Sequence, residues 1–320
     1  MSFTTEIKRE LLSRKNESSC CEYAMLSAYL HGALSVVKNS SGYGFEVQTD
    51  SDFLANYCIK TIERLFGEEV GYYAVKTDKL QGRERFIMKY SGGRCREILQ
   101  ELGFLSKGEE SVLLSGISAY LLENDCCRRA YVKGAFLGVG MATMPEKEVT
   151  RSKATGYHLQ FTFSKYEYAS SFCRLLAEFD FSPKLIERKN GFVIYFKNSQ
   201  TISDLLAFMG ANKSVLRLQD RLVEKSFQND LNRKVNCEMG NMTKQVNAFV
   251  AQKIAITALD ELMGIDNLPE GLPEVCRARL NYPDESMSGL AEKIGISKSC
   301  LNHRLRKVMA IYTEISTEDS

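Results

Sequence analysis

The 320-residue sequence lacks the features of an exported, membrane-embedded or disordered protein. No apolar run approaches the roughly 20 residues needed to cross a bilayer, and the longest, AFLGVGMATM, is far too short. The start, MSFTTEIKRELLSRK, is charged from Glu6 onward and has no apolar stretch like that of a signal peptide. Low-complexity tracts are also absent, and 44% hydrophobic with 26% charged residues is a globular composition. We therefore expect a cytoplasmic protein that does not enter a membrane.

Neither sign of charge is in large excess, because the formal net charge is only +2. The whole chain therefore does not indicate a polyanionic partner, and an interaction with nucleic acid has to rest on local clusters of basic residues. The length suits two domains better than one, since single hydrophobic cores usually stop growing at somewhat smaller sizes.

Ten cysteines are present, but no Cys-x-x-Cys pair of the kind that binds zinc occurs. In a chain of this size such cysteines are typical of reduced thiols rather than of a disulfide framework. Two adjacent pairs stand out, Cys20-Cys21 and Cys126-Cys127, and adjacent cysteines rarely bridge each other. We interpret the thiols as structural or incidental and expect no metal and no cofactor, with a metal or redox site as the alternative.

The two cysteine pairs begin similar segments that lie 106 residues apart, CCEYAMLSAYLHGALSVV from Cys20 and CCRRAYVKGAFLGVGMAT from Cys126. Each segment reads as a helix, and each is followed by two strands, a second helix, a hairpin and a third helix. The sequence therefore predicts an α+β fold built from a tandem αββαββα repeat.

Small residues recur in the first helix of each copy. Ala28 and Gly32 in one copy, and Gly134 and Gly138 in the other, would let the two helix backbones approach closely. The two sheets would then form a saddle beneath this helix pair. We expect an N-terminal helix in 1–19, the duplicated domain in 20–215 with repeats at about 20–105 and 126–212, a linker in 216–235, and an all-α domain in 236–320 with a helix-turn-helix at about 286–309.

The segment VKGAFLGVG, from Val132 to Gly140, resembles the LAGLIDADG motif of homing endonucleases, which carry the same αββαββα unit in tandem. In active members the motif has an acidic residue before its last glycine, because the hard cations of a nuclease take oxygen ligands. The corresponding residues here are Ala33 and Val139, which cannot bind a metal ion. The resemblance therefore implies the fold without the catalysis, and we expect no enzyme.

The last part of the chain has the spacing of a helix-turn-helix. Ala291 is small where the two helices would cross, Gly295 permits the turn, and Leu301 would fill the space between the helices. Ser286 and Ser297 are typical N-cap residues for these two helices.

The helix after this turn separates apolar from polar side chains. At about 100° per residue, Leu301, Leu305 and Val308 fall on one face. Every charge from Lys293 to Lys307 is positive, whereas a merely solvated helix would mix both signs. The sequence therefore predicts a recognition helix that contacts double-stranded DNA through Lys298, Ser299, Asn302, His303, Arg304, Arg306 and Lys307.

Four segments together resemble the WhiA family of bacterial regulators over nearly the whole chain: SFTTEIKREL, the doubled cysteine helices, NRKVNCEMGNMTK and ISKSCLNHRLRK. That family joins a degenerate LAGLIDADG domain to a C-terminal helix-turn-helix. The resemblance implies a DNA-binding protein that acts in sporulation, cell division or chromosome segregation. It also implies a WhiB-type iron-sulfur partner protein in some members.

Four functions are compatible with these patterns. The favoured one is a non-enzymatic transcriptional regulator that binds DNA with sequence preference and is associated with the nucleoid. The second is a nucleoid or division factor that binds DNA without controlling a promoter. The third is a metal-dependent DNA endonuclease that uses other carboxylates, and the fourth is a thiol or metal sensor that uses the paired cysteines.

Overall fold

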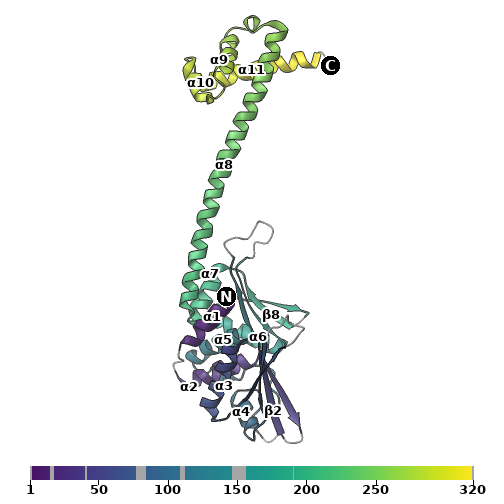
Figure 1. Cartoon of the computed structure of the whole chain (residues 1–320), viewed down its shortest axis with the longest axis vertical. Coiled ribbons are helices and arrows are strands. Elements are labelled where there is room, and N and C mark those ends of the chain that lie inside the picture. Colours follow the sequence, from purple (N-terminus) through teal and green to yellow (C-terminus); the bar gives the residue numbers. More distant parts are fainter. Residues whose placement is uncertain are drawn as a thin grey trace. The chain divides into compact units, whose positions relative to one another are not determined.

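The computed structural model describes residues 2–14, 18–39, 42–76, 84–108, 112–145, 156–189 and 191–318, which form two compact units, 1–224 and 225–320 (Figure 1). The strands lie in the first unit, and the second unit is helical. The predicted fold class, a duplicated α+β domain followed by an all-α domain, is confirmed. In the part of the chain that the structure describes, no helix combines the length and the apolar composition that crossing a bilayer requires.

The first unit begins with helix α1 (Phe3–Ser13) and then repeats one pattern of elements. The first repeat comprises α2 (Ser19–Leu30), β1 (Leu34–Asn39), β2 (Gly42–Thr49), α3 (Asp52–Phe66), β3 (Gly71–Lys76), β4 (Glu84–Tyr90) and α4 (Cys95–Glu101). A short 3-10 helix, η2 (Ala119–Leu122), precedes the second repeat. That repeat comprises α5 (Asp125–Val139), β5 (Gly140–Thr143), β6 (His158–Phe163), α6 (Tyr166–Ala177), β7 (Lys184–Arg188), β8 (Gly191–Phe196) and α7 (Ser199–Met209).

Each repeat forms its own antiparallel four-stranded sheet. The strand order is β1-β2-β4-β3 in the first sheet and β5-β6-β8-β7 in the second, so the two sheets share one topology. In β6, Leu159, Phe161 and Phe163 are buried and alternate with more exposed residues, as expected for a sheet with one face on the core. Figure 1 shows the strands of both repeats together at one side of this unit, with α1, α2 and α3 at the other side.

Helices α2 and α5 pack with their backbones in contact. A Cβ atom on Gly134 would overlap the carbonyl oxygen of Met25, and a Cβ atom on Gly138 would lie 2.5 Å from that of Tyr29. Glycine is therefore required at both positions, and the predicted close approach of the two repeats is confirmed. Because Met25 faces Gly134 and Tyr29 faces Gly138, the helices run parallel, and their N-termini lie at the same end of the pair.

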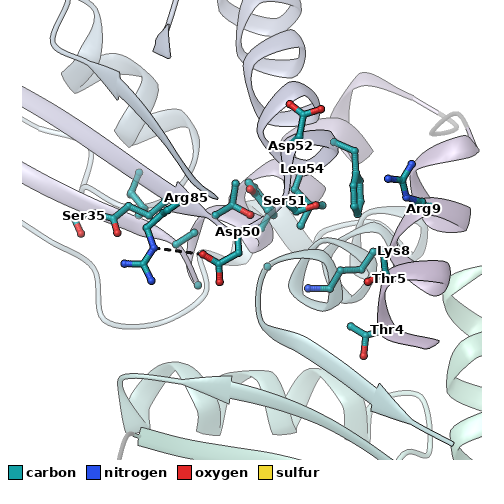
Figure 2. A pocket seen from close by; sticks show the side chains of 18 residues that line it. Thr4, Thr5, Lys8, Arg9, Ser35, Asp50, Ser51, Asp52, Leu54 and Arg85 are labelled. Carbon is teal, nitrogen blue, oxygen red and sulfur yellow. Dashed lines mark hydrogen bonds and ion pairs between the residues drawn. The ribbon is translucent and has the colours of Figure 1, made fainter. Parts of the chain in front are cut away.

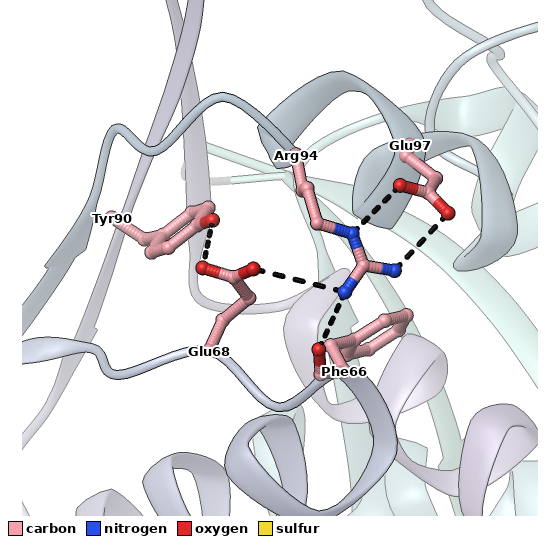
Figure 3. Close-up of polar contacts among 5 residues, drawn as sticks. All are labelled: Phe66, Glu68, Tyr90, Arg94 and Glu97. Carbon is pink, nitrogen blue, oxygen red and sulfur yellow. Dashed lines mark hydrogen bonds and ion pairs between the residues drawn. The ribbon is translucent and has the colours of Figure 1, made fainter.

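A polar network around Arg94 joins the end of α3 to β4 and α4 (Figure 3). The Arg94 guanidinium donates to both carboxylate oxygens of Glu97, at 2.8 and 3.1 Å, and to the carbonyl oxygen of Phe66 at 2.7 Å. Glu68 lies 3.7 Å from the same guanidinium and accepts from the Tyr90 hydroxyl at 2.7 Å. These contacts fix the start of α4, whose first turn has no side-chain cap.

Helix α1 holds the start of the long helix α8 (Asn212–Met263). The Glu10 carboxylate accepts from the backbone N–H groups of Lys213 at 2.7 Å and Ser214 at 2.9 Å, and from the Ser214 hydroxyl at 2.7 Å. The N–H groups of a first helical turn have no partner within their own helix, and a carboxylate there also meets the positive end of the helix dipole. Glu10 is therefore the N-terminal cap of α8, supplied from the other end of the first unit's sequence.

The second unit contains the rest of α8 together with η3 (Ile265–Asn267), α9 (Leu272–Asn281), α10 (Met287–Lys293) and α11 (Lys298–Glu318). One apolar cluster joins α8, α9 and α11, and another joins α9, α10 and α11. The Arg279 side chain links these helices, because it donates to the Gln252 side-chain oxygen at 3.0 Å and to the Glu285 carbonyl oxygen at 3.2 Å.

Candidate nucleic-acid interface

Helices α10 and α11 form the helix-turn-helix that the spacing predicts. Ser286 caps α10 by accepting from the N–H of Gly289 at 3.1 Å, and Ser297 caps α11 by accepting from the N–H of Cys300 at 3.1 Å. Between the two helices Gly295 has a φ of 67°, a left-handed conformation that glycine adopts without steric cost. The two caps and the turn are confirmed.

One face of α11 is buried inside the second unit. Leu301, Leu305 and Val308 are at most 2% exposed, as predicted. Leu301 and Leu305 share an apolar cluster with Ala291 of α10, the small residue expected at the helix crossing. Each fully buried leucine contributes roughly 2 kcal/mol, so this packing fixes which face of α11 is turned to solvent.

The opposite face of α11 is polar and exposed. Ser299, Asn302, His303 and Arg306 are all exposed and recur at the three- and four-residue spacing that places side chains on one side of a helix. At 1.5 Å per residue they form a row about 10 Å long, here called the α11 row. The major groove of B-DNA is about 12 Å wide and admits a helix, so the row has the dimensions of a base-reading surface.

Three cations of α11 are not engaged inside the protein. Lys298, Arg306 and Lys307 are exposed, and none of them forms an ion pair with another residue that the structure describes. Lys293, by contrast, lies 2.9 Å from the Glu285 carboxylate. Of the two helices of the helix-turn-helix, α11 therefore carries the positive charges that are available to a partner.

Arg304 lies apart from the other predicted DNA contacts. Its guanidinium donates to the carbonyl oxygen of Gly271 at 3.2 Å and lies 3.7 Å from the Glu274 carboxylate. A Cβ atom on Gly271 would lie only 2.9 Å from the Arg304 guanidinium carbon, so this group is packed against the start of α9. Arg304 thus holds α9 against α11 and would have to leave these partners to reach DNA.

A second polar surface lies in the first unit, at the C-terminal end of the α2 and α5 pair (Figure 2). A cleft of about 860 Å³ is lined there by Gly32, Ala33 and Gly138, together with side chains from α1, β2 and α3. Val139 packs over Gly32, where a Cβ atom would overlap the valine side chain. Alanine and valine thus stand where the motif of an active nuclease carries its carboxylates.

The two carboxylates of this cleft, those of Asp50 and Asp52, each have a side-chain partner. The Arg85 guanidinium lies 3.4 Å from the Asp50 carboxylate (Figure 2). The Asp52 carboxylate accepts from the Asn56 side chain at 3.0 Å. Burial lowers the pKa of the Lys8 amine to about 8, so this amine loses its positive charge at a mildly alkaline pH. Within the described ranges, no group of three or more carboxylates or histidines converges in this cleft.

The structure brings together four cysteines from the two repeats. Cys20 and Cys21 lie in the first turn of α2, Cys126 and Cys127 lie in the first turn of α5, and all four sulfur atoms are within 4.8 Å of one another. The interpretation of these thiols as structural or incidental rested on the missing Cys-x-x-Cys motif and on the rarity of disulfides between adjacent cysteines, and it did not anticipate this convergence. Two signals in the sequence could have revealed it, namely the equal position of both pairs in the repeat and the small residues that bring the helices together.

The fold and the exposed row define a class of protein, in which a LAGLIDADG-like domain without catalytic carboxylates is followed by a helix-turn-helix domain. Sequence models of the WhiA N-terminal LAGLIDADG-like domain, the WhiA LAGLIDADG-like domain and the WhiA C-terminal HTH domain match residues 19–105, 128–228 and 231–312, respectively. The chain belongs to the WhiA family.

Individual relatives are similar over nearly their full length. The probable cell division protein WhiA of Alkaliphilus oremlandii (strain OhILAs) is 34% identical over 98% of this chain and 98% of that protein. The protein of the same name from Clostridium acetobutylicum is 33% identical over 99% of each chain. The crystal structure of full-length DUF199/WhiA from Thermatoga maritima has the same fold, with a TM-score of 0.57 and 20% identity over 98% of this chain and 99% of that one.

Proposed function

We propose that this protein is a non-enzymatic DNA-binding regulator that inserts α11 into the major groove of double-stranded DNA. The observation that carries the proposal is the α11 row, which the buried leucines of the same helix hold toward solvent. Arg306 and Asn302 have side chains that pair bidentately with guanine and adenine, so these two would read base edges. Lys298 and Lys307 flank the row and would bind phosphates, which fixes the register of the helix on the duplex.

The residues of the first unit favour this role over that of a nuclease. Ala33 and Val139 offer no oxygen ligand for a divalent cation at the end of the helix pair, and the nearby carboxylates of Asp50 and Asp52 are held by other side chains. Supercoiled plasmid should therefore stay intact with Mg²⁺ or Mn²⁺. A cleavage activity that copurifies with the chain and disappears on replacement of Asp50 and Asp52 would contradict the proposal.

Chromosomal occupancy of the intact protein and of its Arg306→Ala variant, mapped in the native host, tests the proposal directly. The most occupied fragment then serves as the probe in fluorescence anisotropy. We expect Arg306→Ala to weaken binding to that fragment by about 1 to 3 kcal/mol, because a bidentate contact to a base is lost. Arg306→Lys keeps the charge but not the planar fork, so it should weaken binding to the preferred fragment far more than binding to unrelated DNA.

Lys253→Ala is the matched control for this experiment. Lys253 is an exposed cation of α8 in the second unit and lies outside the α11 row. Both alanine variants remove one positive charge, so a loss of affinity that reflects only the net charge of the protein would be the same in both. Equal losses of affinity in the two variants would mean that the row does not read bases.

A second function, that of a nucleoid or division factor that binds DNA without promoter control, is favoured by the cell-division name of the relatives. The same occupancy map separates the two. Occupancy at promoters whose transcripts change in the Arg306→Ala strain supports a regulator, whereas even occupancy with a division defect and unchanged transcripts supports the division factor. In either case we infer a location at the nucleoid in the cytoplasm, and a WhiB-type partner stays a prediction for copurification to test.

A further inference from the structure

We propose that Cys20, Cys21, Cys126 and Cys127 form a zinc site that clamps the N-terminal ends of α2 and α5 together. All four sulfur atoms lie within 4.8 Å of one another, and those of Cys126 and Cys127 are 4.0 Å apart. In a tetrahedral site with zinc–sulfur bonds of about 2.3 Å, the sulfur atoms are about 3.8 Å apart. Side-chain shifts of about 1 Å or less would therefore complete the coordination.

The four ligands are positioned by the core of the first unit rather than by a local loop. Each cysteine pair occupies the first turn of its helix, so each pair is fixed to a rigid backbone. The distance between the two helix starts is set by the contacts of Gly134 and Gly138 with the backbone of α2. The ligands are thus held near the required geometry before the metal binds, which lowers the entropic cost of binding.

The dipoles of α2 and α5 would stabilise a negatively charged metal complex at the two helix starts. Binding of one Zn²⁺ releases the four thiol protons to solvent and leaves a complex with a net charge of about −2. The positive ends of the α2 and α5 dipoles both meet at this complex and offset its charge. The Ser18 hydroxyl donates to the Cys21 sulfur at 3.3 Å and lies 2.9 Å from the Cys20 sulfur, a type of support that metal ligands commonly have.

The exposure and size of the cluster favour a single soft metal ion. Cys21 and Cys127 are buried, whereas Cys20 is exposed and Cys126 is half-buried, which gives an ion a path from solvent. Sulfur-only tetrahedral coordination is typical of zinc. An iron-sulfur cluster places several iron and sulfide ions among its thiolates and would need a wider cage.

The zinc ion would stabilise the first unit and would take no part in a reaction in the cleft at the other end of the helix pair. Cys20 lies in the first turn of α2, about 15 Å along the helix axis from its last residue, Leu30, at 1.5 Å per residue, and Ala33 follows beyond that end. A zinc ion with four protein sulfurs also keeps no open position for a substrate. The expected consequence is a more stable first unit, because the metal joins two helices that the unfolded chain does not hold together.

Metal analysis of the full-length chain, purified under reducing and oxygen-free conditions, tests the site. We expect about one zinc ion per chain. The double variant Cys20→Ser, Cys126→Ser removes one ligand from each helix and should lower the zinc content at least about tenfold. Cys237→Ser is the matched control, because Cys237 is an exposed cysteine of α8 in the second unit, and this variant should keep its zinc.

Titration of the metal-free protein with Co²⁺ gives a second readout that does not depend on how the protein was purified. The spectrum should acquire the absorption of tetrahedral, thiolate-bound cobalt, saturate at about one ion per chain, and disappear when zinc is added. Circular dichroism of each variant shows whether it is folded, and the single variant Cys20→Ser at the exposed ligand replaces the double variant if that one does not fold.

Four results would overturn the proposal. They are a folded and reduced wild-type chain that takes up neither zinc nor cobalt, a folded double variant that binds cobalt as the wild type does, an iron cluster in place of zinc, and recovery of the four cysteines as disulfides without metal. Each result is obtained without DNA, so it leaves the proposed function of α11 open to its own test.

Discussion

The two units assemble their candidate sites in different ways. In the second unit the α11 row lies within one helix, between Ser299 and Arg306, and the core beneath it only decides which face is exposed. In the first unit the cysteine cluster draws on two helices whose first cysteines are 106 residues apart in sequence. A site of the first kind depends on local periodicity, whereas a site of the second kind depends on the packing of the whole unit.

This difference predicts that the first unit tolerates added volume far less than α8 does. Gly134→Ala places a Cβ atom on the carbonyl oxygen of Met25, so α2 and α5 must separate, and we expect the free energy of unfolding of the first unit to fall by about 3 kcal/mol. At Gly240 of α8 an added Cβ atom would meet no atom within 4 Å apart from the neighbouring backbone of its own helix, so Gly240→Ala should instead raise helix stability by roughly 0.5 to 1 kcal/mol.

Urea denaturation of both variants, combined with hydrogen exchange on peptides of α2, α5 and α8, measures these effects unit by unit. A Gly134→Ala protein that unfolds at the same urea concentration as the wild type would show that the first unit tolerates added volume as well as α8 does. A loss of stability in Gly240→Ala would also contradict the prediction, because it would show that α8 is closely packed at that position.

A half-buried histidine with a buried ring nitrogen makes the first unit sensitive to acid. His31 follows α2 directly, and its ring lies 4.3 Å from the ring of Phe104 and 4.0 Å from that of Tyr168. Its Nε2 atom is buried and has no hydrogen-bond partner among the described residues. Burial, with a smaller contribution from the charge of Lys165, lowers the pKa of His31 from 6.5 to about 3, so the folded unit holds this imidazole neutral.

The sign of the resulting pH dependence follows from proton uptake. Below pH 6.5 the unfolded chain protonates His31 and the folded chain does not, so stability falls as the pH drops from 6.5 toward 3. Between pH 7 and pH 5 this residue alone should cost the first unit about 2 kcal/mol. His31→Phe keeps an aromatic ring between Phe104 and Tyr168 and should make the stability of the first unit less dependent on pH. His303→Phe, on the exposed α11 row, should leave the pH dependence of the first unit unchanged. Identical pH dependences of unfolding in wild type and His31→Phe would show that the imidazole is hydrated.

Much of the fold could be predicted from the sequence because its signals are local or repeated. The doubled cysteine helices gave the αββαββα repeat, since one pattern occurs at two places in the chain. The helix-turn-helix could be located from Ala291, Gly295 and Leu301, because each has a steric task set by its neighbours in sequence. The outward face of α11 followed from the 3.6-residue period alone.

Neither helical periodicity nor a Cys-x-x-Cys search predicted the cysteine cluster or the contacts of Arg304. A Cys-x-x-Cys search looks for ligands on one loop, whereas these ligands converge only after Gly134 and Gly138 have brought two helices together. Arg304 lies at the edge of the polar face, and its hydrogen bond to the Gly271 carbonyl oxygen depends on how α9 packs against α11. Both features depend on contacts between distant segments, about which helical periodicity carries no information.

The caps of α8 and α11 allow the same comparison, because the cap of α8 is distant in sequence and the cap of α11 is a neighbouring residue. Glu10 caps α8 from a position 203 residues earlier in the chain. Glu10→Ala removes the acceptor for two N–H groups and should lower the free energy of unfolding of the first unit by about 1.5 kcal/mol. Glu10→Gln keeps one acceptor oxygen and should lose about half as much. Thermal unfolding and exchange of the first-turn amides of α8 measure the effect, and unchanged exchange in Glu10→Ala would mean that water replaces the carboxylate without loss.

The smallest expected effect concerns the local cap of α11, and it separates stability from DNA binding. Ser297→Ala removes the bond to the Cys300 N–H and should destabilise the second unit by about 1 kcal/mol. Ser297→Asp keeps a side-chain oxygen for that bond, so stability should stay within a few tenths of a kcal/mol of the wild type.

The aspartate adds a negative charge beside Lys298, however, so DNA affinity should fall and the slope of log K against log salt should decrease by about one. Denaturation and salt-dependent anisotropy on the same two variants distinguish these effects. Equal destabilisation by alanine and aspartate would mean that the cap does not position α11, because a residue that preserves the hydrogen bond would then be no better than one that removes it.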